Sequence, residues 1–266
     1  MTWVIGATPP FGGYGLMISD IQVSLATGER FDILRKVHPV GPCLVLGFSG
    51  SVKIGFAMVE NLRARLQLPP DAPANAMWIP AYVADAWASK AVAVFAQAEA
   101  TERALGCKLL LVGVHPTETV GMPNARAYVI RMAAPLFRPG FSPKRLVSVL
   151  SIGSGSRVLA YRKTVREAFG NWNLFQAEVQ NTGGWGRTIA HILSVTIERH
   201  LEPGISNHLH IADVRRGRIT IYSNDRTDFL PNDEKQAVRM PRTASSYTEF
   251  CQMLEDRNAQ GVAVIC

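Results

Sequence analysis

The sequence predicts an α+β fold in which helices cover antiparallel sheets. Two observations carry this prediction: segments rich in strand formers come in neighbouring pairs, and each block of them is followed by helical segments. With 266 residues, of which 47% are hydrophobic, the chain can bury a substantial core. No repeat and no linker divides it. We therefore expect a single domain over 1–266, with its core at about 2–225 and a C-terminal extension over 226–266.

The first fifty residues read as paired strands. The segment ATPPFGGY lies between two runs of strand formers, which is typical of a hairpin with a longer loop. An extended segment then continues to the turn at Thr27-Gly28, and PVGP separates a second pair. The expected strands are 3–7, 15–19, 21–25, 33–38 and 43–48.

Helical periodicity begins after this block. In SVKIGFAMVENLRARLQL, apolar residues recur every three or four positions, and LPPDAP ends the pattern. The Ala-rich segment 78–104 has no breaker after Pro80, which predicts one long helix.

The second half repeats the alternation of strands and helices. We expect strands over 108–114, 127–132 and 146–152, helices over 157–169 and 187–200, and a last hairpin of 209–214 with 219–223. The segment 224–246 is polar and predicts a loop, and a short helix is expected over 247–257. NWNLFQAEVQNTGGWG is interpreted as an insertion between the two helices, and GVAVIC as an edge strand.

Composition argues against several classes of protein. No apolar run approaches the roughly 20 residues of a membrane helix, and the start lacks a signal peptide, so we expect a cytoplasmic protein without a membrane partner. The net charge of +7 is dispersed and lacks an aromatic-basic signature, which disfavours a nucleic-acid partner. The four cysteines, the GSGS and GGYG segments, and the pair His208 and His210 lack the spacing of metal or phosphate sites. No cofactor is expected.

The residue that follows the initiator methionine is a threonine, Thr2. A threonine at the chain end is a nucleophile whose general base is its own α-amine. The amine titrates at about 7.7–8.0 and is tethered close to the hydroxyl, so little orientational entropy is lost. Met-Thr starts are common, and Thr2 alone would be weak evidence.

A site of this kind needs further groups, and the sequence offers them at strand ends. A cation depresses the pKa of the nucleophile, a carboxylate holds the cation, and a backbone N–H stabilises the oxyanion. Asp20 closes the segment ISD, Lys36 lies in ILRKV, and Gly50 in LGFSGS stands at a junction of strand and helix.

Together, Thr2, Asp20, Lys36 and Gly50 resemble the proteasome β-subunit family, including bacterial HslV-type and ancestral β-subunit-type peptidases. The spacing from Asp20 through Lys36 to Gly50 fits without a gap, whereas the stretch from Thr2 to Asp20 is two residues longer. VLSIGSGSRVLAYR and RITIYSND resemble later segments of the family, so the resemblance spans most of the chain up to Asp225. It implies a four-layer αββα sandwich, the fold of N-terminal nucleophile hydrolases.

The resemblance implies a role for each matching residue. Thr2, freed by removal of Met1, would be nucleophile and base, with Lys36 beside it and Asp20 paired to the lysine. The N–H of Gly50 would form the oxyanion hole, and Ser154 of GSGS would assist proton transfer. Ser24 would hold an extended substrate through its main chain. The specificity pocket would be lined by Val23, Leu34, His38, Phe48 and Val52, and Phe48 at its base favours small or medium apolar side chains.

The implied activity is cleavage of peptide bonds through an acyl-enzyme ester, within a homo-oligomer that is a ring or a spiral. Peptides or proteins would be the substrates, and an unfoldase partner is not identified. The family often places an Asp and a Ser after its last long helix, where this chain reads IERHLEPGISNH, leaving Glu198, Glu202 and Ser206 as candidates. Two alternatives therefore remain: a non-catalytic assembly protein of the same fold, and an amidase for small acylated amines.

Overall fold

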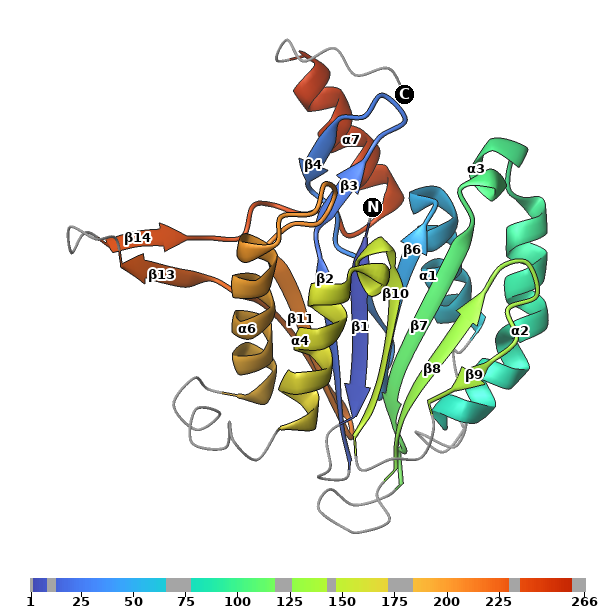
Figure 1. The fold of residues 1–266 in the computed structure, drawn as a ribbon. Helices are drawn as coiled ribbons and strands as arrows, with labels where there is room; N and C mark the ends of the chain where they lie inside the picture. Colours follow the sequence, from blue (N-terminus) through green and yellow to red (C-terminus); the bar gives the residue numbers. More distant parts are fainter. Residues whose placement is uncertain are drawn as a thin grey trace.

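Two antiparallel five-stranded sheets lie face to face at the centre of the molecule, with helices on both outer faces (Figure 1). The structure is a computed structural model that describes residues 2–8, 13–65, 78–117, 126–142, 147–171, 184–229 and 235–259. The predicted α+β class with antiparallel sheets is confirmed.

The first sheet has the strand order β10-β1-β2-β11-β12 and contains both the start and the later half of the chain. Its strands are β10 (Ser148–Gly153), β1 (Trp3–Thr8), β2 (Tyr14–Asp20), β11 (Leu209–Arg215) and β12 (Arg218–Ser223). The second sheet consists of β5 (Val37–Gly41), β6 (Leu44–Gly50), β7 (Cys107–Val114), β8 (Ala127–Ala133) and β9 (Gly140–Phe141), in that order.

Helices cover each sheet on its outer face. The first sheet carries α4 (Leu159–Gly170) and α6 (Trp185–Arg199), preceded by the short helix η1 (Ser154–Arg157). The second carries α1 (Val52–Arg65) and α2 (Pro80–Gln97), with α3 (Ala100–Ala104) after them. None of the helices within the described ranges is both long and apolar enough to cross a membrane.

Alternation along the strands supplies the two faces of each sheet. In β1, Val4 points into the core between the sheets, where it joins Val112, whereas Ile5 points towards α4 and α6. On the outer face of the second sheet, Leu111 of β7 belongs to the same buried cluster as Trp87 of α2. This gives three apolar clusters and therefore the four-layer arrangement that the resemblance implied.

Smaller elements gather where the chain begins. Strands β3 (Gln22–Ser24) and β4 (Arg30–Asp32) form a hairpin, and α7 (Tyr247–Ala259) lies beside it (Figure 1). A second hairpin, β13 (Arg226–Phe229) with β14 (Lys235–Val238), projects from the body of the molecule.

The predicted strand over 33–38 is wrong in its bounds. Its first residues bond instead with the C-terminal extension, because Leu34 forms a parallel bridge with Ala244 and the N–H of Arg35 donates to the Ala244 carbonyl. The strand proper, β5, starts at Val37 and includes Pro39 and Gly41, which were expected in a turn. A proline is tolerated there because β5 is an edge strand.

Two further expectations need correction. The long helix over 78–104 is broken, because Ala98 and Glu99 have extended backbone angles and separate α2 from α3. The Arg103 guanidinium donates to the carbonyls of Ala96 and Ala98 across this break, a contact that no local pattern shows. The segment 224–246 is not only loop, since it contains the β13–β14 hairpin. The GVAVIC end and most of the proposed insertion (172–183) lie outside the described residues.

Candidate active site

A buried ion pair joins the two sheets near the start of β1. Asp20 is the last residue of β2 in the first sheet, and Lys36 immediately precedes β5 in the second. Lys36 Nζ lies 2.8 Å from Asp20 Oδ2, and both side chains are 0% exposed. Lys36 Nζ also donates to the carbonyl of Gln22 at 2.5 Å. The ammonium is thus held by two acceptors within the protein.

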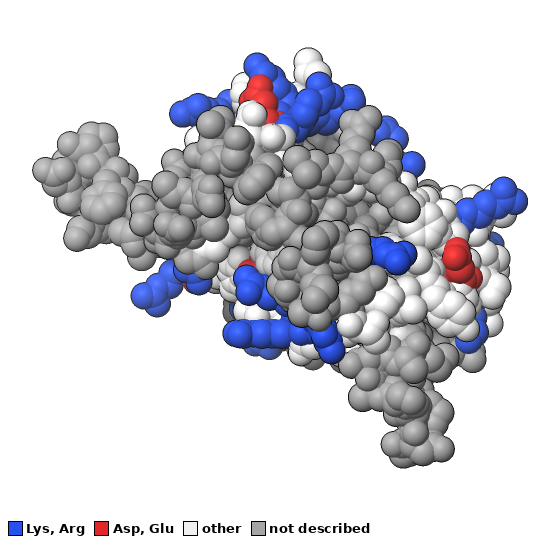
Figure 2. Space-filling model, turned by 90° about the horizontal axis from the view of Figure 1, so that it is seen from below, with Lys and Arg blue, Asp and Glu red and all other residues white. Residues whose placement is uncertain are grey.

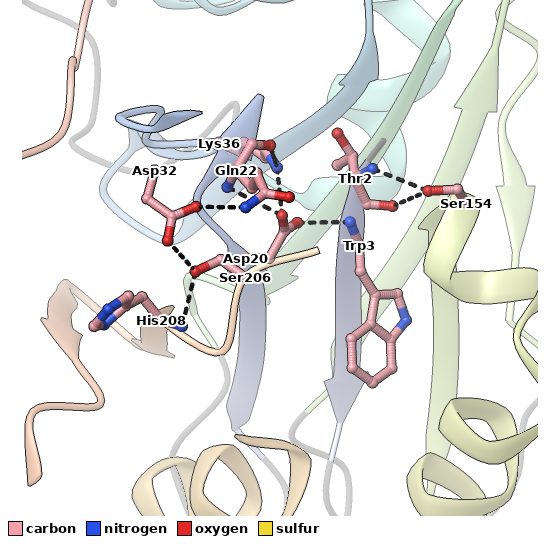
Figure 3. A network of polar contacts seen from close by, with 9 residues as sticks. All are labelled: Thr2, Trp3, Asp20, Gln22, Asp32, Lys36, Ser154, Ser206 and His208. Carbon is pink, nitrogen blue, oxygen red and sulfur yellow. Dashed lines mark hydrogen bonds and ion pairs between the residues drawn. The ribbon is translucent and has the colours of Figure 1, made fainter. Parts of the chain in front are cut away.

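Asp20 connects this lysine to the backbone next to Thr2 (Figure 3). Its Oδ1 accepts from the N–H of Trp3 at 2.6 Å, while its Oδ2 accepts from Lys36 Nζ and from the N–H of Gln22 at 3.1 Å. Burial raises the pKa of Asp20, and these three donors oppose that rise by stabilising the ionised carboxylate. The carboxylate therefore fixes the position of the lysine relative to the amide that follows Thr2.

Burial changes the acidity of the lysine. Removal from water lowers the pKa of the Lys36 ammonium, and the attraction of Asp20 opposes this shift. Asp20 therefore favours the charged ammonium, which burial alone would disfavour.

Thr2 is anchored by the turn at Ser154. The Thr2 N–H donates to Ser154 Oγ at 3.1 Å, and the Thr2 carbonyl accepts from the N–H of Gly155 at 3.3 Å. Ser154 Oγ also lies 3.3 Å from that carbonyl. In the chain with Met1 attached, this nitrogen belongs to a peptide bond. Once Met1 is removed, the same nitrogen is the α-amine and keeps Ser154 as its neighbour.

Gly50 ends β6 at the start of α1 and is exposed. Its φ of +105° lies in the left-handed region, and a Cβ there would lie 2.2 Å from the Gly106 carbonyl oxygen. Directly after it, the N–H of Ile54 donates to Ser51 Oγ at 3.0 Å, which caps the helix. Gly50 therefore stands where the positive end of the helix dipole favours an anion.

The residues predicted to line a specificity pocket lie together and are mostly covered. Val23, Leu34 and Phe48 belong to one buried cluster, and Val52 packs partly buried against it. His38 stacks on Phe48 with ring centroids 5.7 Å apart. Ser24, at the end of β3, is only half-buried. His38 and Phe48 are 0% and 1% exposed.

Two buried histidines lie close to this cluster. Burial, with Arg35 as the next cause, lowers the pKa of His38 to about 3 and that of His210 to about 4. Unfolded, both would titrate near 6.5. The stability that they contribute is present above pH 6.5, where both states bind no proton, and it is lost as the pH falls from 6.5 towards 4.

We therefore expect the free energy of unfolding to fall by about 1 kcal/mol per histidine between pH 7 and pH 5.5. Urea unfolding at the two values checks this. His38→Phe removes one of the two contributions and makes the profile flatter. Equal pH dependence in His38→Phe and the wild type would contradict the assignment.

Sequence reasoning missed a second carboxylate in the same network (Figure 3). Asp32 Oδ1 accepts from Gln22 Nε2 at 3.0 Å, and its Oδ2 accepts from Ser206 Oγ at 2.6 Å. Its charge raises the pKa of Lys36, although Asp20 does so more strongly. Asp32 and Ser206 are 174 residues apart in sequence, so no local motif joins them.

Of the three candidates in IERHLEPGISNH, Ser206 joins this network through Asp32. Glu198 Oε1 accepts from Asn207 Nδ2 at 2.9 Å in an exposed position, and the Glu202 carbonyl accepts from the N–H of Ile205 at 3.2 Å. Among the residues that the structure describes, no group of three or more His, Cys, Asp or Glu is arranged to hold a metal ion.

Comparisons with known proteins bear on the fold. The sequence matches no family model and no curated protein. A solved structure, "Anbu (ancestral beta-subunit) from Yersinia bercovieri", is similar over 100% of both chains, with a TM-score of 0.54 and 13% sequence identity. At this identity the likeness establishes the fold. The resemblance predicted from the sequence, and with it the αββα fold of N-terminal nucleophile hydrolases, is confirmed at that level.

Proposed function

We propose that the chain is a hydrolase of the proteasome-like kind that cleaves peptide bonds with Thr2 as its nucleophile. One observation carries the proposal: the buried Lys36–Asp20 pair is hydrogen-bonded to the backbone amide that follows Thr2. A buried ion pair is costly to desolvate and gives a fold little net stability. Its position beside a potential N-terminal nucleophile therefore supports a role in chemistry.

The reaction begins once Met1 has been removed. Thr2 Oγ1 attacks the substrate carbonyl carbon as its proton passes to the α-amine, and the Lys36 ammonium favours the developing negative charge on Oγ1. The carbonyl oxygen becomes an oxyanion and accepts from the Gly50 N–H. Collapse of this intermediate transfers the proton to the leaving amine and leaves an ester on Thr2. Water then attacks the ester, releases the acid and restores the hydroxyl.

The neighbours of Thr2 support this sequence of proton transfers. Ser154 Oγ is within hydrogen-bond reach of the Thr2 nitrogen, so it can stabilise either protonation state of the amine. Ser24 and Gly50 end strands β3 and β6, where an extended substrate would add as a further strand. Phe48 at the base of the predicted pocket favours substrates with small or medium apolar side chains.

Covalent labelling tests the proposal. We expect a peptide β-lactone to add once to the protein, as seen by intact mass, and peptide mapping to place the adduct on Thr2. Thr2→Ala should give no adduct, whereas Thr27→Ala, at an exposed turn, should label as the wild type does. N-terminal sequencing of the same sample establishes removal of Met1. A fully processed chain that takes no label would refute the nucleophile, and turnover of acylated amines without turnover of peptides would favour the amidase alternative.

We also propose that the chain acts as a homo-oligomer. Among the residues that the structure describes, six large apolar side chains are exposed by about half or more, and such side chains are candidates for contacts between copies of the chain. They are Tyr82, Leu105, Leu136, Phe141, Leu159 and Leu201. Light scattering after size-exclusion chromatography should give a mass several times 29.1 kDa. A monomer at micromolar concentration would contradict this.

A further inference from the structure

A pocket of about 490 Å³ lies between α4 and the edge strand β10, outside the catalytic network. In Figure 1, α4 lies in front of the first sheet and β10 runs along the border of that sheet. The volume is in the range of small-molecule sites.

The floor of the pocket is apolar. Trp3 and Phe169 line it and are 2% and 1% exposed. Val147 and Val149 lie on the helix-facing side of the sheet, yet they are only half-buried. Apolar surface on this side of β10 is therefore left partly open for a ligand to cover.

The rim of the pocket is cationic. Arg162 and Arg166 are one helical turn apart on α4, line the pocket and are exposed. Within the described part of the chain, neither guanidinium has a hydrogen bond or an ion pair. The acidic residue nearest in sequence, Glu167, lies 3.9 Å from Lys163 Nζ on the neighbouring face. Like charges at this spacing repel, and an anion bound between them would relieve that repulsion.

We infer that this pocket binds an organic carboxylate with an apolar body. The planar guanidinium groups of Arg162 and Arg166 match the two oxygens of a carboxylate, and the apolar body lies on Val149 and Phe169. The lining is more apolar than polar, with Ser142 and Ser151 as its uncharged polar side chains, so it offers few groups to replace the water around a multiply charged anion. The arginines disfavour cations. More widely, blue side chains outnumber red ones on the face drawn in Figure 2, in line with the net charge of +7, which attracts anions.

Two kinds of ligand fit this description. One is a medium-chain carboxylic acid, and the other is the C-terminal residue of a peptide that ends in an apolar side chain. Both present one carboxylate on an apolar group. The pocket also touches the catalytic region through a single residue, since Trp3 lines it with its ring while its N–H donates to Asp20.

Calorimetry on the full-length Thr2→Ala chain tests the inference without depending on catalysis. The ligands are octanoate, octylamine, and N-acetyl-leucine as acid and as amide. We expect octanoate or N-acetyl-leucine acid to bind, and octylamine and the amide not to bind. The tighter of the two acids identifies the source. Arg162→Gln/Arg166→Gln should weaken binding at least tenfold, and Val149→Trp should block it by filling the floor.

The matched control is Arg199→Gln/Arg218→Gln, which removes the same charge from exposed positions outside this pocket and should change the dissociation constant less than twofold. Three results would each overturn the inference: no binding of either acid at millimolar concentration, equal binding of octylamine, or an equal loss in the control. Binding in the Thr2→Ala chain together with failure of Thr2 labelling would uphold this site and refute only the proposed function.

Discussion

Replacing Lys36 with Met is expected to lower the free energy of unfolding by about 3–5 kcal/mol and to abolish labelling of Thr2. The loss of stability arises because Asp20, at 0% exposed, loses its ammonium partner, so it is either buried as an unpaired charge or takes up a proton. The loss of labelling arises because no cation then favours the ionised Thr2 hydroxyl. Urea unfolding and intact mass after β-lactone treatment measure the two effects separately.

The double variant Lys36→Met/Asp20→Asn separates stability from chemistry. The introduced amide is uncharged and still offers one oxygen to the Trp3 N–H, so part of the lost stability should return. Labelling should not return. Lys53→Met breaks a comparably short ion pair, with Glu99 at 2.6 Å, but at an exposed site, and should change stability little. Strictly additive effects of the two active-site substitutions would contradict a coupled buried pair.

Replacing Gly50 with Ala is expected to cost about 2–5 kcal/mol of stability and to suppress labelling. Two causes act together: the left-handed φ of +105° strains any residue with a Cβ, and that Cβ would lie 2.2 Å from the backbone oxygen of Gly106. Relief requires a shift of the backbone that carries the proposed oxyanion donor. Thermal unfolding and the rate of adduct formation measure the outcome.

Gly28→Ala is the matched control for this change. Gly28 also has a left-handed φ, +89°, but a Cβ added there would meet no described atom within 4 Å. Its substitution should cost about 1–2 kcal/mol and leave the labelling rate unchanged. Equal losses of stability in Gly50→Ala and Gly28→Ala would show that the contact with Gly106 does not contribute to the loss.

Local patterns predicted most elements because burial and periodicity coincide in them. The strands around Val4, Met17 and Val112 alternate between two buried faces, and α1 shows helical spacing of its apolar residues. The break between α2 and α3 was missed because it depends on Arg103, which reaches back over the break to carbonyl groups. The start of β5 was missed because Leu34 pairs with Ala244, 210 residues later.

The candidate site divides in the same way. Thr2, Asp20, Lys36 and Gly50 were predicted from their residue types and from the resemblance of their order and spacing to those of a known family. Asp32 could not be predicted in this way, because its partner Ser206 is 174 residues away in the sequence. The pocket beside α4 was also invisible, because Trp3 and Phe169 meet only through packing.

The amino-acid sequence by itself determined the strand and helix pattern, the antiparallel α+β class and the four residues of the proposed reaction. These depend on residue type and spacing along one chain segment. Only the tertiary structure decided that the Lys36 ammonium lies 2.8 Å from Asp20, that Asp32 joins the network, and that Arg162 and Arg166 rim an apolar pocket. Such contacts join residues from different sheets and helices, and their geometry exists only once the layers have packed.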